Sequence, residues 1–388
     1  MAVPLDGVRV LDLSQAVSGP YAGRVLADLG ADVVKVEWPR GDITNAFGEV
    51  RGGLSGLFTQ MNAGKRGIGI DRTSPGGADL LRGLAGRSDV VIENFRPGVL
   101  DRAELGYETL SVDNPGLVML SISGFGRTGP DAERQAYAPV IHAESGLLMR
   151  QAELDGRPVR DLCLALADTL AALHGAIAVL AALQMRERTG RGQHIDLSML
   201  EAMISSDDYA HNAVDGNYDL YAARGEVFEA VGGPIMIAAD RKTLWSKVSR
   251  HAGLADPSLP NGDLDAKIAA RVSVVSEWVR AFDDRTALIQ ALEAADLPWA
   301  DLRTTDTILD SPSLVARESV STIDDCAGGR RGVVRMPYRF SDADCDVSRG
   351  APTRGQHNEV VLADWLGLGT AEIASLEEAG VLTRLLET

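Results

Sequence analysis

The chain has 388 residues, of which 45% are hydrophobic and 24% charged, and its formal net charge is −17. This balance is typical of a soluble globular protein, and the length favours two domains or one large α/β unit. The negative charge argues against a nucleic-acid or anionic-membrane partner, although local arginines and lysines can still form a positive pocket.

The first third of the chain alternates segments typical of strands and helices. Strands are predicted at 7–14, 32–37, 66–71, 89–95 and 117–125, with helices at 19–30 and 76–88 between them. The strand segments are continuous runs rich in Val, Ile and Leu, as expected for parallel strands that are covered on both faces. Repeated β-α-β units with short turns predict an α/β fold with a doubly wound parallel sheet.

The middle of the chain is predicted to be mostly helical from 139 to 203, with a short strand at 194–198. A strand at 234–239 and three following helices indicate a smaller α+β domain, and the tail returns to one strand and two helices. We therefore expect four segments: 1–205 as the first part of a large domain, 206–228 as a polar linker, 229–312 as the small domain, and 313–388 as a return linker with the C-terminal part of the large domain.

Sequence patterns also predict the cellular compartment and argue against a membrane-spanning segment. Three cysteines form no CxxC pair, and the N-terminus has no basic segment followed by an apolar one, so we expect a cytoplasmic protein. The longest apolar segment, 164–183, contains an aspartate and a histidine, and its uninterrupted part is shorter than the roughly 20 residues that a membrane span needs. We predict a buried helix there.

The turn "SGPYAG" follows the first predicted strand, where parallel sheets bind ligands. The backbone amides of Ser18 and Gly19 can receive phosphate or carbonyl oxygens at a helix N-terminus, although a tight turn without a ligand fits the same residues. Basic residues at the strand ends are expected to converge on a polyanionic ligand, with dispersed surface charge as the alternative for each one. They are Lys35, Arg40, Lys65, Arg66, Arg96 and Arg102.

The sequence lacks the motifs of several other common catalytic and binding sites. The six histidines have no metal-ligand spacing, so no metal site is predicted. No GxSxG motif is present, and the missing GxGxxG motif argues against a dinucleotide-dependent oxidoreductase.

Asp168 stands beside the apolar segment and has two interpretations. It suits the N-cap of a helix that begins at Thr169. A carboxylate at a helix N-terminus is also stabilised in its ionised form, and in a dry cleft it is a usable nucleophile. The residues alone leave both interpretations open, and one residue can serve both roles.

Several ordered motifs resemble one known family. The chain carries "VRVLDLSQAVSGPYAGRVLADLGADVVKVE", "DVVIENFRPGVLDRAELGYETL", "ALADTLAALHGAIAVLAAL", "RERTGRGQHIDLSMLEA" and "APTRGQHNEVVLADWLGLGTAEIASLEEAGVL". They resemble the class III CoA-transferases (the CaiB/BaiF family), which include formyl-CoA and carnitine CoA-transferases and α-methylacyl-CoA racemases. The resemblance covers residues 5–205 and 350–384 well and the part between them more weakly.

The resemblance implies an acyl-CoA and a carboxylic acid as substrates, with no tightly bound cofactor. It gives Asp168 the role of the nucleophile, which carries anhydride and aspartyl-CoA intermediates. It also implies a Rossmann-like large domain built from both chain ends, an inserted small domain and an interlocked homodimer. The implied CoA contacts are Val17, Ser18, Arg40, Lys65, Arg66, Asn94, Phe95, Arg96, Arg102 and Tyr137.

The sequence departs from the family at several positions. Val17 stands where formyl-CoA transferase has Gln, and Trp38 where it has Arg. Tyr137 and Ala138 replace the His-Asp pair of the racemases, which argues against the alternative activity of an acyl-CoA racemase or epimerase. Ala138 also lacks the acidic group of many transferases, and the Gly-rich flap expected within 220–235 is reduced to "EAVGGP". These two departures leave a CoA-binding protein without turnover as a further alternative.

Overall fold

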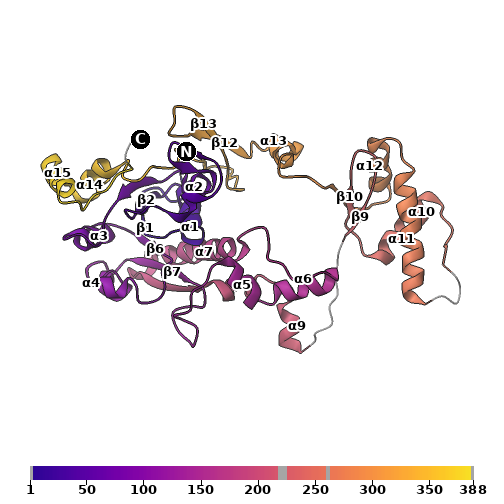
Figure 1. Cartoon of the computed structure of the whole chain (residues 1–388), viewed down its shortest axis with the longest axis horizontal. Helices are drawn as coiled ribbons and strands as arrows, with labels where there is room; N and C mark the ends of the chain where they lie inside the picture. Colours follow the sequence, from indigo (N-terminus) through magenta and orange to yellow (C-terminus); the bar gives the residue numbers. More distant parts are fainter. Residues whose placement is uncertain (1–2, 217–224, 259–262, 386–388) are drawn as a thin grey trace. The chain divides into compact units, whose positions relative to one another are not determined.

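The computed structural model describes residues 3–216, 225–258 and 263–385 (Figure 1). The chain divides into two compact units. The first comprises Met1–Tyr218 and Ala316–Thr388, and the second comprises Asp219–Val315. Each unit has its own hydrophobic core, and all residues of the candidate site lie in the first.

A six-stranded parallel sheet forms the centre of the first unit, as the sequence predicts. Its order is β5 (Arg66–Gly69), β2 (Asp32–Glu37), β1 (Arg9–Asp12), β6 (Val90–Glu93), β7 (Val118–Ser123) and β8 (Gln193–Ser198). The chain leaves β1 toward one edge through β2 and β5, and then returns to the other side through β6, β7 and β8. This is the strand order of a Rossmann fold.

Adjacent residues of each strand point to opposite faces, and both faces are covered. Val10 belongs to the core beneath helices α1 (Ser18–Asp28) and α7 (Leu166–Thr189), whereas Leu11 belongs to the core beneath α3 (Gly77–Ala85) and α14 (Asn358–Leu366). This double burial explains why the strands have continuous apolar sequences rather than alternating ones.

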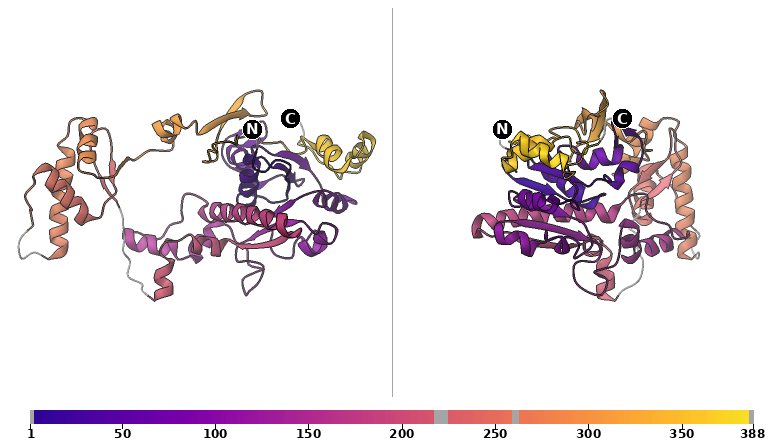
Figure 2. Two further views of the ribbon diagram at one scale, coloured as in Figure 1. Left: turned by 180° about the vertical axis from the view of Figure 1, so that it is seen from behind. Right: turned by 60° about the vertical axis from the view of Figure 1, so that its left-hand side comes forward.

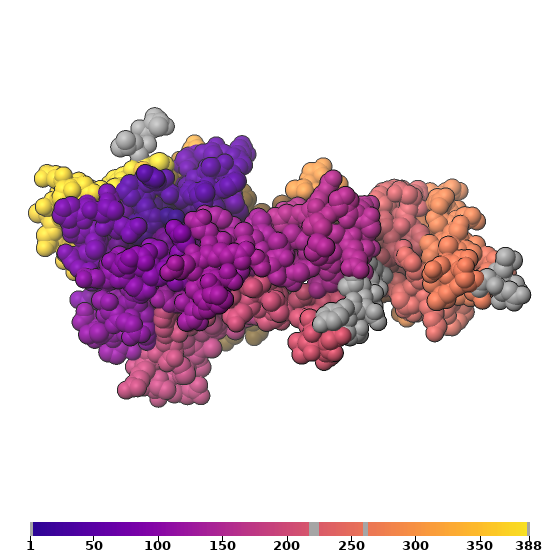
Figure 3. Space-filling view, turned by 60° about the horizontal axis from the view of Figure 1, so that its bottom comes forward, coloured from indigo at the N-terminus to yellow at the C-terminus, as the bar shows by residue number. Residues whose placement is uncertain are grey.

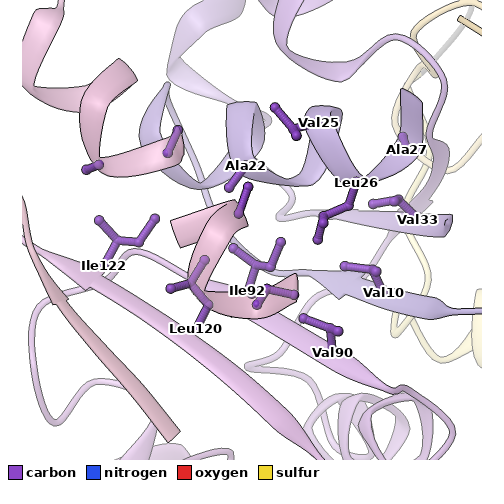
Figure 4. Packing of buried hydrophobic residues seen from close by; sticks show 14 of the residues in the cluster. Val10, Ala22, Val25, Leu26, Ala27, Val33, Val90, Ile92, Leu120 and Ile122 are labelled. Carbon is purple, nitrogen blue, oxygen red and sulfur yellow. The ribbon is translucent and has the colours of Figure 1, made fainter. Parts of the chain in front are cut away.

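Helix α1 supplies one side of the first core. Figure 4 shows Ala22 and Leu26 of this helix directed toward strand residues such as Val10 and Ile92, and Val25 belongs to the same core. All five side chains are at least 98% buried. This packing fixes the position of α1, and therefore of its N-terminus, relative to the sheet.

Helix α7 is the predicted buried helix. It packs against α1, β7 and β8, and Figure 2 (left) shows it running alongside the sheet. By length and composition it could cross a membrane, but 50% of its most apolar window is buried inside the structure. We therefore describe it as a core helix. It begins at Leu166, three residues before the predicted start.

The C-terminal segment completes the first unit. The backbone N–H groups of Gly67 and Gly69 in the edge strand β5 donate to the side chains of His357 and Asn358, each at 3.0 Å. In the space-filling view of Figure 3 the C-terminal segment lies against the N-terminal part of the unit. Side chains and helices thus cover an edge that would otherwise expose unpaired backbone groups.

The second unit contains the antiparallel sheet β11 (Trp299–Asp301), β10 (Ile235–Ile237) and β9 (Glu226–Phe228). Three helices cover it: α10 (Arg241–Ala252), α11 (Leu264–Arg280) and α12 (Arg285–Ala294). The expected polar linker, 206–228, includes α9 (Ala210–Asp215) and β9. Its residues 217–224 lie outside the described residues, as does part of the expected flap segment.

The remaining elements are short. They are α2 (Gly56–Asn62), α4 (Tyr107–Asp113), α5 (Ala138–Glu144), α6 (Leu147–Asp155), α8 (Met199–Ser205), α13 (Pro312–Ala316), α15 (Thr370–Glu378) and the antiparallel pairs β3 (Val50–Arg51) with β4 (Leu54–Ser55) and β12 (Val320–Asp324) with β13 (Arg330–Val334).

Candidate active site

The site lies where the direction of the chain across the sheet reverses. β1 and β6 are neighbours, and the connections that follow them lead to opposite sides of the sheet. Such a reversal opens a crevice at the carboxyl ends of parallel strands. The loop 13–17 and the residues that begin at Asn94 border this crevice.

Asn94 holds the loop 13–17 in place. Its Oδ1 accepts the backbone N–H of Gln15 at 2.8 Å, and its Nδ2 donates to the Gln15 carbonyl at 2.7 Å and to Ser18 Oγ at 3.1 Å. Asn94 is one of the predicted CoA contacts. Both ends of its amide are engaged within the protein, where it orients Ser18, and its contact with CoA stays a prediction.

The same loop has a backbone that is tightly constrained. Ala16 has φ 63°, a left-handed conformation that is unusual for alanine, and its N–H donates to the Asp42 carboxylate at 3.3 Å. Gly19 packs directly on the loop, because a Cβ at this position would lie 2.2 Å from Ser14 Cβ. The first turn of α1 is therefore positioned by close backbone contacts.

Lys65 supports this region through hydrogen bonds within the protein. Its Nζ donates to Asp12 Oδ2 at 2.7 Å, to the Pro20 carbonyl at 2.7 Å and to Asn62 Oδ1 at 2.9 Å. The side chain is fully buried, and burial lowers its pKa to about 8. All three ammonium donors are used internally, which gives Lys65 a structural role, and its contact with CoA stays a prediction.

Arg66 is also placed away from the crevice. It begins β5 and therefore lies at the amino end of the sheet, where it pairs with Asp32 and with Asp364. Its guanidinium lies 5.9 Å from the centre of the Trp365 ring. Arg66 is adjacent to Lys65 in the sequence, which predicted a shared role, but a parallel strand binds ligands at its carboxyl end and Arg66 lies at the amino end of β5.

Asp168 faces the crevice from the first turn of α7. It is the third residue of the helix and 9% exposed, whereas the residue at the N-cap is Ala165. The predicted N-cap role is therefore wrong. The helix begins earlier because the backbone N–H of Ala167 has a partner from outside it, Nε2 of His142 at 3.2 Å.

Donors from two other helices surround the Asp168 carboxylate. Burial raises its pKa, while hydrogen bonds from the Ser18 hydroxyl, the Ser18 amide and the Ala138 amide oppose this change. Ser18 begins α1 and Ala138 begins α5. Helix N-termini carry free N–H groups and partial positive charge, which suits a carboxylate and a developing oxyanion.

Two other predicted residues flank these donors. Val17 is the N-cap of α1 and Tyr137 is the N-cap of α5. Val17 is half-buried, and the Tyr137 side chain is 64% exposed. Both therefore adjoin the amides that face Asp168.

Aromatic and basic side chains follow the carboxyl ends of β2, β5 and β6. The ring centroids of Trp38 and Phe95 are 6.1 Å apart, and the Arg72 guanidinium lies 5.8 Å from the Trp38 ring centroid. Arg40, Arg96 and Arg102 are exposed in the same loops. The sequence analysis missed Arg72, although its place just after a predicted strand was the available signal.

Glu93 is a second buried carboxylate beside the crevice that the sequence analysis missed. It ends β6 and accepts the backbone N–H of Phe95 at 2.8 Å. Burial raises its pKa to about 7. Among the described residues no group of three or more His, Cys, Asp or Glu side chains is arranged to hold a metal ion.

Comparisons with known proteins agree on one family. The model of "CoA-transferase family III" matches residues 5–358. The chain is 32% identical to a formyl-CoA:oxalate CoA-transferase of Streptomyces avermitilis, covering 98% of this chain and 100% of that protein. It is also 32% identical to a succinyl-CoA:mesaconate CoA-transferase of Haloarcula hispanica, covering 94% of this chain and 97% of that one.

A solved structure has the same fold. The crystal structure of a CaiB/BaiF family protein from Brucella suis matches with a TM-score of 0.81 and 31% sequence identity. The match covers 94% of this chain and 100% of that chain.

Proposed function

The chain belongs to CoA-transferase family III, a family of enzymes that move CoA between an acyl-CoA and a carboxylate, and from this premise we propose that Asp168 carries the transfer through covalent intermediates. The observation that supports this most is the surroundings of Asp168. A buried carboxylate lies at the ligand end of the sheet, with its raised pKa opposed by donors from Ser18 and Ala138. Reduced solvation makes a carboxylate a better nucleophile than it is in water.

The reaction begins with attack of an Asp168 carboxylate oxygen on the thioester carbonyl. The C–S bond breaks, CoA leaves as a thiolate, and a mixed anhydride joins the acyl group to Asp168. The thiolate then attacks the Asp168 carbonyl carbon, which releases the first acid as its carboxylate and leaves an aspartyl-CoA thioester.

The acceptor acid reverses these steps. Its carboxylate attacks the aspartyl thioester and releases the CoA thiolate, which gives a second anhydride. The thiolate attacks the acceptor acyl carbon of that anhydride, so that the new acyl-CoA leaves and the Asp168 carboxylate is restored. Exchange between an acid and a thioester is nearly isoenergetic, so no further reactant is required.

The protein's contribution is to hold the partners together and to stabilise charge. The amides of Ser18 and Ala138 are suited to the oxyanion that forms at the attacked carbonyl, because they are fixed before the reaction starts. Exclusion of water protects both anhydrides from hydrolysis. Val17 and Tyr137 flank these amides and are suited to contact the thioester end of CoA.

The exposed end of the crevice suits the nucleotide part of CoA. We assign the adenine ring to the neighbourhood of Trp38 and Phe95, where stacking and the Arg72 guanidinium favour a planar base. Arg40, Arg96 and Arg102 suit the phosphates, because guanidinium groups bind phosphate oxygens in pairs. These arginines thus let a protein of net charge −17 bind the phosphate groups of CoA at one positively charged part of its surface.

We also propose that two chains form an interlocked homodimer in the cytoplasm. The resemblance of the motifs supports this arrangement. Large apolar side chains exposed on the first unit support it as well, since burial against a partner chain removes them from water. They include Met149 and Ile177, each 64% exposed.

Intact-mass spectrometry tests the covalent role of Asp168. Formyl-CoA and succinyl-CoA serve as donors, with oxalate, mesaconate and malate as acceptors, because the names of the relatives include these acids. We expect a CoA-sized adduct that hydroxylamine removes and that Asp168→Ala lacks. An undiminished adduct in Asp168→Ala would overturn the proposed role. Exchange of the α-hydrogen of a 2-methylacyl-CoA with deuterium would instead indicate a racemase.

A further inference from the structure

A histidine behind the nucleophile belongs to no step of the proposed reaction. His142 lies on α5 and is 1% exposed. Its Nε2 accepts the backbone N–H of Ala167 at 3.2 Å, and its Nδ1 lies 2.8 Å from Asp161 Oδ1. Both ring nitrogens are therefore engaged within the protein.

These two contacts determine the protonation state of the ring. A backbone N–H can only donate, so Nε2 must be unprotonated and must accept. The proton then lies on Nδ1, which donates to the Asp161 carboxylate. His142 is therefore a neutral imidazole with one tautomer, fixed by a carboxylate in the loop that precedes α7.

The contact with Ala167 fixes the turn that carries Asp168. The first N–H groups of a helix have no partners inside the helix, and that of Ala167 is one of them. The next residue is Asp168, whose carboxylate receives the Ala138 amide from the same helix α5. Helix α5 therefore contacts the first turn of α7 twice, through the backbone amide of Ala138 and, about one turn later, through the side chain of His142.

We infer that His142, oriented by Asp161, is a positioning residue for the nucleophile. By holding the Ala167 amide it keeps the Asp168 carboxylate directed at Ser18 and Ala138 and at the thioester carbonyl. This inference rests on the proposed role of Asp168. His142 is not an acid or base for the substrate, because it is buried and neither ring nitrogen is available.

Two substitutions separate the contacts of His142. In His142→Gln the side-chain oxygen reaches the place of Nε2 and accepts the Ala167 amide. In His142→Asn the shorter amide can still donate to Asp161 but leaves Ala167 without its acceptor. Both replace the imidazole by an uncharged amide, so they form a matched pair.

We expect His142→Asn to lower kcat by about 10- to 100-fold, since a misplaced reacting group costs rate rather than affinity. The KM for acyl-CoA stays within about twofold, because the hydrogen-bond partners of His142, Asp161 and Ala167, are not among the proposed CoA contacts. His142→Gln retains kcat within about threefold of the wild-type value. Steady-state transfer and the rate of aspartyl-CoA formation in a single turnover measure these effects.

Hydrogen exchange followed by mass spectrometry gives a readout that does not depend on activity. Amides in the first turn of α7 are expected to exchange faster in His142→Asn than in His142→Gln or in the wild-type protein, while the melting temperatures of the two variants agree. Equal kcat values in the two variants, or a loss confined to KM, would overturn the inference, as would equal exchange.

The two proposals fail in different ways. A wild-type protein that forms no adduct contradicts the role of Asp168 as the nucleophile, and with it the positioning role of His142. A normal wild-type adduct together with equal behaviour of the two His142 variants contradicts only the inference about His142.

Discussion

At the scale of single residues, the unusual feature is a carboxylate beside a long apolar helix. Removing Asp168 from water raises its pKa, and three hydrogen-bond donors on Ser18 and Ala138 only partly offset this cost. The donors do not belong to its own helix but to α1 and α5. Asp168 therefore depends on segments that are distant in the sequence for its protonation state.

Ser18→Ala tests this dependence. The hydroxyl of Ser18 lowers the pKa of Asp168, so its removal raises that pKa further. Less Asp168 is then ionised at acidic pH, and the acid limb of kcat/KM moves to higher pH. We expect kcat/KM at neutral pH to fall by about 10-fold, the effect of one lost hydrogen bond to a charged group.

Ser205→Ala is the control for this measurement. Ser205 is an exposed serine at the end of α8, and its hydroxyl donates only to the Ala202 carbonyl of the same helix at 3.3 Å. We expect this variant to keep the pH profile of the wild-type enzyme. A Ser18→Ala enzyme with the same acid limb as the wild type would contradict the proposed effect on Asp168.

At the scale of elements, local pattern predicted strands well where both faces are buried. The segments 7–14, 32–37, 66–71, 89–95 and 117–125 each contain a strand of the parallel sheet. The sixth strand, β8, was expected only as an isolated short strand. It lies at the sheet edge and is mostly half-buried, so polar residues such as His194 and Asp196 interrupt its apolar pattern.

The helix that carries Asp168 shows the opposite case. A cap prediction considers only neighbouring residues, and it placed the helix start at Thr169. The helix begins at Leu166, where its first turn receives a hydrogen bond between Ala167 and His142, which are 25 positions apart. No local signal contains this contact.

Gly19→Ala tests the tight junction between β1 and α1. The new Cβ would lie 2.2 Å from Ser14 Cβ and 3.5 Å from Asn94 Cγ, so α1 or the loop must shift. We expect kcat/KM to fall at least about 10-fold, because the Ser18 amide then no longer faces Asp168. Overpacking also lowers the free energy of unfolding by about 1–3 kcal/mol.

Gly56→Ala provides the matched comparison. Gly56 lies at the start of α2, and a Cβ there would meet nothing within 4 Å. This variant is expected to keep its activity and to gain up to about 1 kcal/mol of stability. Transfer assays and denaturant titrations measure both variants, and equal behaviour of the two would contradict the steric argument.

At the scale of the whole molecule, the sheet separates charges that are adjacent in the sequence. Lys65 and Arg66 differ by one position, yet one is buried against Asp12 and the other pairs with Asp32 and Asp364. Arg40, Arg72, Arg96 and Arg102 remain exposed in the loops after the strands. The positively charged surface proposed to bind CoA is therefore formed by these four exposed arginines.

The interlocked dimer is a prediction about the whole molecule. We expect light scattering coupled to size exclusion to give twice the chain mass of 41.2 kDa at every protein concentration. Because threaded chains cannot separate while folded, the dimer mass and the helical circular dichroism signal are expected to be lost together during denaturation. A dimer that dissociates on dilution into folded monomers would contradict the interlocked arrangement.

The parallel α/β sheet, the buried apolar helix and the family resemblance that points to Asp168 could all be predicted from the sequence, because they depend on runs and motifs of adjacent residues. Only long-range contacts show which helix N-termini face Asp168, that Lys65 is buried against Asp12 while Arg66 lies at the opposite end of the sheet, and that His142 holds the first turn of α7. Each of these depends on contacts between residues far apart in the chain. Burial sets the pKa of a side chain, and the fold decides whether its hydrogen-bond donors are engaged within the protein. The neighbouring residues in the sequence show neither property.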